Sequence, residues 1–349
     1  MKFEALTIKD IAKALHLSVS TVSKALRGSH EISEETKATV MAYAREYNYK
    51  PNPIAQSLKR GRSKSIGVIV CNIDNNFFSQ VINGIESIAH QKDYNVIITQ
   101  SQESYEREVS NSEHLSSRSV DGLIISLSAE TKNVDHLIKL HEKGLPIVLF
   151  DRVTDEIHTH TVIANNYKGA YEGTRHLLQQ GFQRIAHITS AKSLSITLER
   201  LAGYKAALED AGLTPDEQYI KFCQHGGMIQ EETYQALAEL LQLPDKPDAI
   251  FTASDRLSTT TLSQLRKMQI KVPREIALVG FTNSISADIF NPALTSVIQP
   301  ALEMGRLATE MLIQLIESKR PVTVFETRVL ETELTIRDSS IKEIANKLP

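Results

Sequence analysis

The sequence predicts an α/β protein in which a small all-α head precedes two doubly wound α/β lobes. Three observations predict this fold class. Residues 1–50 contain three helical patterns, each preceded by a residue that caps helices. From residue 65 onward, short apolar runs alternate with amphipathic stretches, which is typical of parallel strands covered by helices. The 349 residues suffice for two or three domains and contain too many strand–helix units for one compact sheet.

Two helical patterns begin the head, and a turn of only a few residues separates them. Thr7, followed three residues later by Asp10, predicts a capped helix start, and apolar residues then recur at helical spacing as far as Leu15. Ser18 can cap a second helix over residues 19–26. Two helices joined so closely pack at a steep angle, as in a helix-turn-helix.

The second helix carries side chains that suit a DNA-reading surface. Three apolar residues can face the first helix, namely Val22, Ala25 and Leu26. Four polar residues remain on the outer side or at the N-terminal end, namely Ser20, Thr21, Ser23 and Lys24. Hydroxyls bond phosphates or base edges, and lysine reaches guanine acceptors. Any small three-helix domain is the alternative.

A third helix is predicted after Ser33, followed by a short fourth helix and a basic linker. The third helix has an expected apolar face of Val40, Met41, Ala44 and Tyr47. Asn52 and Pro53 are a capping residue and a first-turn proline, and PIAQSLK follows them. A helix this short is marginal in water, and the linker RGRSK comes after it.

Charge is distributed unevenly along the chain. Residues 1–64 hold 12 Lys/Arg and 6 Asp/Glu, a net charge of +6, whereas the rest holds 27 and 36, a net charge of −9. A basic end on an acidic body indicates that the end meets a polyanion. A solvated basic tail is the alternative that charge alone leaves open.

Composition excludes several classes of protein. Apolar residues make up 41% and charged residues 23%, as in soluble globular proteins. No stretch approaches the ~20 consecutive apolar residues of a membrane span, and Glu4 and Lys9 interrupt any secretory signal. We therefore expect a cytoplasmic protein without membrane contact. Cys71 and Cys223 fit no metal or redox spacing, and we expect both to be buried. We expect neither a metal nor a cofactor.

The body alternates between predicted strands and predicted helices. Seven apolar runs are predicted strands: 66–71, 94–99, 122–126, 146–150, 185–189, 249–253 and 276–281. Eight amphipathic stretches are predicted helices: 79–92, 105–118, 134–143, 167–180, 198–211, 230–242, 256–268 and 302–317. Ligands in such folds bind beyond the carboxyl ends of the strands.

Polar residues stand at several of these strand ends. Asp151 follows PIVLF, Asp255 follows FTAS and Asn283 follows VGFT, while Arg200 lies in ERLAGY. Carboxylates and amides that accept from hydroxyls, with an arginine that donates, suit a polyhydroxylated ligand such as a sugar. Asp151 and Asp255 could instead cap the helices that follow them. Arg200 could instead form an ion pair on the surface. Phe77 and Phe78 either line this cleft or pack inside the lobe.

Residues 7–59 resemble the DNA-binding head of the LacI/GalR (lactose-repressor-like) family of bacterial transcriptional regulators. The motifs are T-I-K-D-I-A, S-x-x-T-V-S-K-A-L and Y-N-Y-x-P-N-x-x-A-x-x-L, and the resemblance continues through nearly the whole chain. It implies that Val19, Ser20 and Lys24 read bases while Thr21 and Ser23 anchor the helix to phosphates. The expected DNA contacts are Thr7, Ser18, Val19, Ser20, Thr21, Ser23, Lys24, Asn52, Ala55, Leu58 and Lys59.

The resemblance also implies a hinge helix within residues 51–64. This helix would order on DNA and pair with its mate in a homodimer, and Leu58 would enter the minor groove as an apolar wedge. Packing of Leu58 against the third helix is the alternative. The tail after residue 338 has only Ile341, Ile344 and Leu348 as large apolar residues, which are too few for a stable coiled coil, so we expect no tetramer of that kind.

For the body, the resemblance implies two lobes of the periplasmic-binding-protein-like type I, with an effector cleft between them. Three crossings are expected near 164–166, 291–294 and 324–328. The head would then span 1–50 and the hinge 51–64. The expected N-terminal lobe is 65–164 plus 292–325, the C-terminal lobe is 165–291 plus 326–338, and the tail is 339–349.

Two departures from the family pattern bear on the effector. Thr282 stands where the family usually has aspartate, and Met228 stands where several sugar-responding members have a stacking aromatic. The expected effector-binding residues are Phe77, Phe78, Asp151, Arg200, Met228, Asp255, Thr282 and Asn283. A sugar or sugar derivative is the expected effector, with a phosphorylated sugar, a nucleoside or a partner protein as alternatives.

The expected function is that of a ligand-responsive, sequence-specific transcriptional regulator, a repressor of carbohydrate-utilisation genes that binds a palindromic operator as a homodimer. A doubly wound enzyme is disfavoured because the sequence contains no G-x-G-x-x-G after a strand, no P-loop, no G-x-S-x-G and no H-E-x-x-H. The segment HGGM at 225–228 is only weakly similar to an oxyanion loop. A small-molecule receptor without DNA activity is the remaining alternative, which the intact head argues against.

Overall fold

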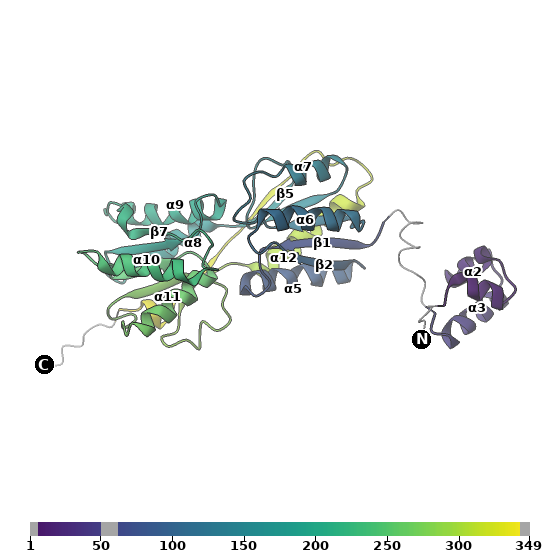
Figure 1. Cartoon of the computed structure of the whole chain (residues 1–349), viewed down its shortest axis with the longest axis horizontal. Coiled ribbons are helices and arrows are strands. Elements are labelled where there is room, and N and C mark those ends of the chain that lie inside the picture. Colours follow the sequence, from purple (N-terminus) through teal and green to yellow (C-terminus); the bar gives the residue numbers. More distant parts are fainter. Residues whose placement is uncertain (1–5, 50–61, 343–349) are drawn as a thin grey trace. The chain divides into compact units, whose positions relative to one another are not determined.

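The computed structural model describes residues 6–49 and 62–342. The chain divides into two compact units, Met1–Ser63 and Lys64–Pro349 (Figure 1). None of the helices in the described part of the chain is long and apolar enough to cross a membrane.

In the first unit, the described residues 6–49 form three helices: α1 (Ile8–Ala14), α2 (Val19–Leu26) and α3 (Glu34–Glu46). Each is capped by a hydroxyl, as predicted. The Thr7 side chain accepts from the backbone of Asp10, and Ser18 and Ser33 cap α2 and α3 in the same way. Five buried residues from all three helices form the core: Ile11, Ala12, Val22, Ala25 and Val40.

The expected apolar face of α3 is partly wrong. Val40 and Ala44 are buried, but Met41 and Tyr47 are 37% and 52% exposed. The face of α3 that packs against the core consists of Val40, Tyr43 and Ala44, which share one side of the helix because they are three or four residues apart. Met41 lies beside that face. Tyr47 instead stacks on Tyr43, with ring centroids 4.5 Å apart.

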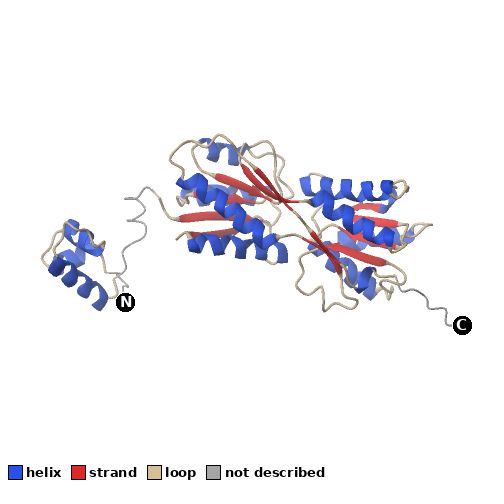
Figure 2. Ribbon diagram, turned by 180° about the vertical axis from the view of Figure 1, so that it is seen from behind, coloured by secondary structure: helices blue, strands red, loops and turns tan. Residues whose placement is uncertain are grey.

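The second unit contains two six-stranded sheets, each flanked by helices on both faces (Figure 2). In the N-terminal lobe the strand order is β11-β5-β4-β3-β1-β2, with all neighbours parallel. Its strands are β1 (Ser65–Val70), β2 (Asn95–Gln100), β3 (Gly122–Ile125), β4 (Ile147–Phe150), β5 (His160–Ala164) and β11 (Thr327–Leu330). Its helices are α5 (Asn76–Gln91), α6 (Tyr105–Ser117), α7 (Asp135–Glu142) and α12 (Ala301–Glu317).

Helices α5 and α12 cross at two glycines. A Cβ on Gly84 would lie 2.0 Å from the carbonyl oxygen of Leu302, and one on Gly305 would lie 2.1 Å from that of Val81. Only glycine allows the two backbones to approach this closely. The crossing joins a helix that precedes β2 to one that follows β10, and so ties the two parts of this lobe together.

The C-terminal lobe repeats the arrangement with strand order β12-β10-β9-β8-β6-β7, in which only β12 is antiparallel to its neighbour. Its strands are β6 (Ile185–Thr189), β7 (Ile220–Phe222), β8 (Ala249–Thr252), β9 (Ala277–Phe281), β10 (Thr295–Ile298) and β12 (Glu333–Thr335). Its helices are α8 (Asn166–Gln179), α9 (Ser195–Asp210), α10 (Gln230–Gln242) and α11 (Asp255–Lys267), with 3-10 turns η1 (Glu217–Tyr219) and η2 (Asp338–Ser340).

Two of the three expected crossings lie later in the chain than the sequence indicated. The first follows β5, near residues 164–166 as expected. Since β10 pairs with β9, the second comes after Ile298 rather than at 291–294. Since β11 pairs with β5, the third comes after Leu330 rather than at 324–328. Strand pairing therefore moves residues 292–298 to the C-terminal lobe and 326–330 to the N-terminal lobe.

Candidate functional site

The second helix of the head presents a mixed hydroxyl and apolar surface. Val22 and Ala25 are buried against the other helices, which turns Val19 and Ser20 outward at the N-terminal end of α2. Val19 is 42% exposed. Ser20 and Lys24 are four residues apart and so lie on one face, the face on which the sequence predicts base contacts.

Several predicted DNA contacts also have structural tasks in the head. The hydroxyl of Thr7 belongs to the capping box of α1. The Ser18 hydroxyl accepts from the backbone of Thr21 at 3.0 Å and is 2.8 Å from the Thr21 hydroxyl. The four predicted contacts in the hinge lie outside the described residues: Asn52, Ala55, Leu58 and Lys59.

Lys24 has a partner that sequence reasoning missed. Its ammonium group forms an ion pair with Glu31, in the turn between α2 and α3, and this bond lowers the pKa of Glu31. A base or phosphate contact by Lys24 therefore competes with its ion pair to Glu31. The only signal in the sequence is an acidic residue seven positions after a lysine, which does not by itself indicate a pair.

The candidate effector site is a cavity between the two lobes. Seven of the eight predicted residues line it: Phe77, Phe78, Asp151, Arg200, Asp255, Thr282 and Asn283. Met228 does not, because it lies in the turn after β7, where its backbone bonds to His225. Six further residues complete the lining: Asn75, Arg152, Ile196, Ser254, Phe281 and Gln299. The cavity volume is about 40 Å³, room for a few water molecules.

Asp255 is the first residue of α11 and has one carboxylate oxygen engaged. Its Oδ1 accepts from the hydroxyl of Thr282 and, at 3.0 Å, from the backbone N–H of Asn283. Its Oδ2 is buried and has no hydrogen-bond partner among the described residues. Burial raises the pKa of Asp255, and interactions with the Thr282 hydroxyl and with the backbone amides of Asn283, Phe77 and Asn76 partly oppose this. The alternative of helix capping is wrong, because Ser254 caps α11.

Arg200, in α9, is buried and forms hydrogen bonds with two other segments of the C-terminal lobe. Its Nε donates to Asn166 Oδ1 at 2.9 Å, and its Nη1 donates to the carbonyl of Ala253 at 2.6 Å. Its guanidinium carbon lies 3.8 Å from the ring centroid of Phe281. Burial lowers the pKa of Arg200 to about 10. The alternative of a surface ion pair is therefore wrong, since the residue is only 3% exposed.

Asp151 directly follows β4 and has a left-handed backbone conformation, with φ of 59°. The Gln299 side chain donates to it at 3.4 Å. Burial raises the pKa of Asp151, against the opposing charges of Arg200 and Arg152. The alternative of helix capping is wrong here too, because the next element is β5.

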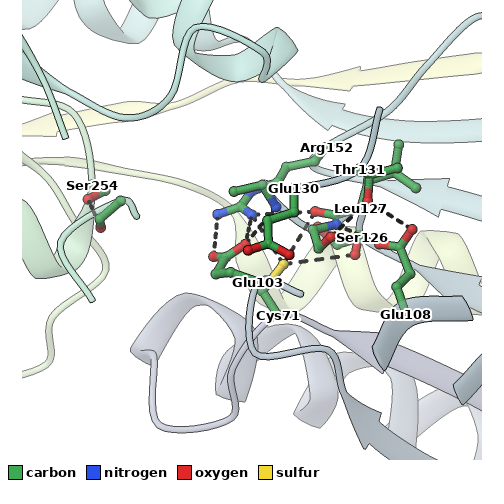
Figure 3. A network of polar contacts seen from close by, with 12 residues as sticks. Cys71, Glu103, Glu108, Ser126, Leu127, Glu130, Thr131, Arg152 and Ser254 are labelled. Atoms are coloured by element: carbon green, nitrogen blue, oxygen red, sulfur yellow. Dashed lines mark hydrogen bonds and ion pairs between the residues drawn. The ribbon is translucent and has the colours of Figure 1, made fainter. Parts of the chain in front are cut away.

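Arg152, which sequence reasoning missed, anchors a polar network at the rim of the N-terminal lobe (Figure 3). Its two terminal nitrogens both donate to Glu103, at 2.5 and 3.0 Å. Its Nη1 also lies 3.3 Å from the Cys71 sulfur. Glu103 additionally accepts from the backbone N–H of Ala129 at 2.9 Å. Arg152 Nε is buried without a partner among the described residues. In the sequence, Arg152 could have been recognised as a site residue because it stands next to Asp151 at the end of a predicted strand.

Direct contacts hold the lobes together around this cavity. Gln80 of α5 and Asn283 bond to each other twice, and Arg256 of α11 forms an ion pair with Asp74. Asn283 Nδ2 also donates to the backbone of Gln299 at 2.7 Å. Asn283 therefore bonds to three other segments, through Asp255 in α11, Gln80 in α5 and Gln299 after β10.

An exposed helix-turn-helix and a body of two lobes around a small polar cavity define a ligand-responsive DNA-binding regulator. Residues 7–52 match the model of the bacterial regulatory proteins, lacI family. Residues 63–337 match that of the periplasmic binding proteins and sugar binding domain of LacI family. The chain belongs to the LacI family, and it is a DNA-binding transcriptional regulator rather than an enzyme.

Individual relatives match over nearly the whole length. The chain is 32% identical over 336 residues to the HTH-type transcriptional regulator RegA of Clostridium saccharobutylicum, covering 95% of this chain and 100% of RegA. It is 28% identical to the transcriptional regulator CelR in its cellobiose complex, with a TM-score of 0.70 over 96% of this chain and 99% of that one. The fold also matches the lac repressor dimer bound to operator and the anti-inducer ONPF, at 23% identity and TM-score 0.82, covering 97% and 100%.

Proposed function

We propose that this regulator is a cytoplasmic repressor of carbohydrate-utilisation genes. It binds a palindromic operator as a homodimer, and its effector is a sugar or sugar derivative that enters between the lobes. The recognition helix supplies Val19, Ser20 and Lys24 to the bases of one half-site. The hinge residues Asn52, Ala55, Leu58 and Lys59 add contacts at the centre of the site.

One observation carries the effector proposal. The cavity is lined both by a residue with a buried, unpaired acceptor, Asp255 Oδ2, and by one with a buried, unpaired donor, Arg152 Nε. A hydroxyl group satisfies both kinds of atom, since it donates one hydrogen bond and accepts others. Leaving such groups unpaired costs about 1–3 kcal/mol each, so a polyhydroxylated ligand recovers that cost. Phe77, Phe78 and Phe281 supply apolar surface for the faces of a sugar ring.

The homodimer proposal has independent support. Ile285 and Ile289, in the segment after β9, are 80% and 82% exposed. Two large apolar side chains this close together and this exposed favour a protein partner. A second copy of the chain also supplies the second recognition helix that a palindrome requires. Among the relatives, the lac repressor was solved as a dimer on its operator.

The proposed switch uses the contacts between the lobes. The cavity of about 40 Å³ is too small for a sugar, so binding has to separate or rearrange the Gln80–Asn283 and Asp74–Arg256 contacts. Because effector and operator would favour different lobe arrangements, each changes the affinity for the other. A coupling of about 1–3 kcal/mol changes operator affinity by roughly 5- to 150-fold.

The test has two arms on the full-length protein. In the first, selection from random duplexes should recover a palindromic site, and gel-shift assays should show its specific retention. A protein that retains no duplex specifically would instead be a receptor without DNA activity. In the second, a thermal-shift screen of sugars, sugar phosphates and nucleosides should find a sugar that raises the unfolding midpoint. Preference for a nucleoside over every sugar would contradict the effector class.

A further inference from the structure

A second cavity lies in the C-terminal lobe, at the end of α11 that is far from the cleft. Its volume is about 380 Å³, within the range of small-ligand sites. The last turn of α11 forms one side, and residues 269–274 and 291–292 form the other. Asp255 in the cleft and the end of this cavity are separated by the whole of α11, about 20 Å at 1.5 Å per residue.

Three basic residues line this cavity: Arg266, Lys271 and Arg274. None of the described residues that line it is acidic. This is notable in a body, residues 65–349, that carries a net charge of −9. Within the part of the chain that the structure describes, the side chains of Arg266 and Lys271 have no hydrogen bond or ion pair, whereas Lys205 and Lys221 in the same lobe are paired with glutamates.

The helix dipole explains only part of this arrangement. Arg266 and Lys267 both stand in the last turn of α11, where a positive charge is favourable by about 0.3–1 kcal/mol. Lys267 also contacts the ring of Tyr234, with its nitrogen 5.5 Å from the ring centroid, and does not line the cavity. Lys271 lies beyond the helix, so the dipole gives no reason for its place.

We propose that this cavity binds a small organic phosphate, at a site separate from the effector cleft. Phosphate oxygens suit a guanidinium fork and a nearby ammonium group, and Arg266 and Lys271 offer one of each. Leu262 and Ile270 provide an apolar floor for the carbon part of the ligand. The lining contains no aromatic ring, so a stacked nucleobase has no support. The proposal does not depend on which molecule enters the cleft.

The experiment is isothermal titration of the full-length protein with glucose 6-phosphate, 3-phosphoglycerate, glucose and inorganic phosphate. We expect at least one organic phosphate to bind, and inorganic phosphate to bind more weakly because it leaves the apolar floor unfilled. Arg266→Gln with Lys271→Gln should weaken binding at least tenfold. Both side chains are exposed, so circular dichroism should find the double variant folded.

Three matched variants locate the site. Lys267→Gln removes the same charge from the same helix end and should leave binding unchanged. Asp255→Asn alters the cleft, and Lys24→Ala alters the basic head, and neither should weaken binding. The proposal is overturned if no organic phosphate binds, if Lys267→Gln weakens binding as much as the double variant, or if binding is lost with Asp255→Asn or Lys24→Ala instead.

Discussion

Gln80 and Asn283 join the two lobes by a reciprocal pair of hydrogen bonds. Gln80 Nε2 donates to the carbonyl of Asn283 at 3.2 Å, and Asn283 Nδ2 donates back to Gln80 Oε1 at 3.0 Å. Gln80 belongs to α5 of the N-terminal lobe, and Asn283 follows β9 of the C-terminal lobe, 203 residues away. The pair therefore reports directly on whether the lobes are closed.

Removing the glutamine side chain should favour open lobes. Gln80→Ala deletes both bonds, each worth about 0.5–1.5 kcal/mol, while Asn283 keeps its bonds to Gln299. We expect a larger radius of gyration by small-angle scattering and faster proteolysis between the lobes. Gln91→Ala, at the exposed end of the same helix, is the control. Identical scattering from Gln80→Ala and wild type would mean that these bonds do not hold the lobes closed.

Neutralising Asp255 should separate stability from ligand response. Asp255→Asn keeps an oxygen for Thr282 and Asn283 but removes a buried charge. Because the folded-state pKa of Asp255 is raised, the charged form is disfavoured in the native protein above that pKa. Near pH 7 the variant should therefore be at least as stable as wild type, and it should lose its response to the effector.

The stability difference between Asp255→Asn and wild type should depend on pH. As pH falls through the folded-state pKa of Asp255 toward the ordinary aspartate pKa of 3.8, wild type takes up the proton in its native state and the penalty disappears. The stability advantage of Asp255→Asn in urea unfolding should then shrink. A variant less stable than wild type by more than about 2 kcal/mol at pH 7 would show that the carboxylate is a structural support.

The fork of Arg200 should not tolerate lysine. Arg200→Lys keeps the positive charge but cannot bond Asn166 and Ala253 together, so a buried acceptor is left unpaired. We expect a loss of about 2–4 kcal/mol in the free energy of unfolding. Arg306→Lys, whose exposed pair with Glu303 spans 3.7 Å, should change it by less than about 0.5 kcal/mol. Equal effects of the two substitutions would refute the structural account of Arg200.

Freeing Lys24 should strengthen DNA binding. Glu31→Gln removes the ion-pair partner of Lys24 and one negative charge near the proposed DNA surface. We expect the operator Kd, measured by fluorescence anisotropy, to fall about two- to fivefold, with a steeper salt dependence. Glu34→Gln removes a charge that pairs with Lys37 instead. If Glu34→Gln strengthens operator binding as much as Glu31→Gln does, the loss of one negative charge explains the gain. The release of Lys24 from its ion pair would then not contribute.

Local signals explain which elements could be predicted. The second head helix was expected at 19–26 and lies at Val19–Leu26, and the helix expected at 230–242 lies at Gln230–Gln242. Caps and apolar periodicity within one segment determine such elements. The strand Ile185–Thr189 was predicted on the same basis, from a continuous apolar run.

The strands that were missed have no such signal. They are β5, β7, β10, β11 and β12, which are three to five residues long and mix polar with apolar residues, as in HTVIA, IKF, TSVI, TRVL and ELT. Their neighbours in the sheets make them strands. The lobe to which each belongs follows from backbone pairing across long sequence distances, so the two later crossings could not be placed from the sequence.

By itself, the sequence determined the three-helix head, the alternation of strands and helices, the family, and most of the polar residues at the strand ends. The motifs involved are local, and the carboxyl ends of parallel strands always meet at one edge of a sheet. Only the tertiary structure decided that Lys24 is paired with Glu31, that Arg152 lines the cleft and Met228 does not, and that Gln80 and Asn283 join the lobes. Each of these depends on side chains from different segments meeting in space, which no periodicity within one segment encodes.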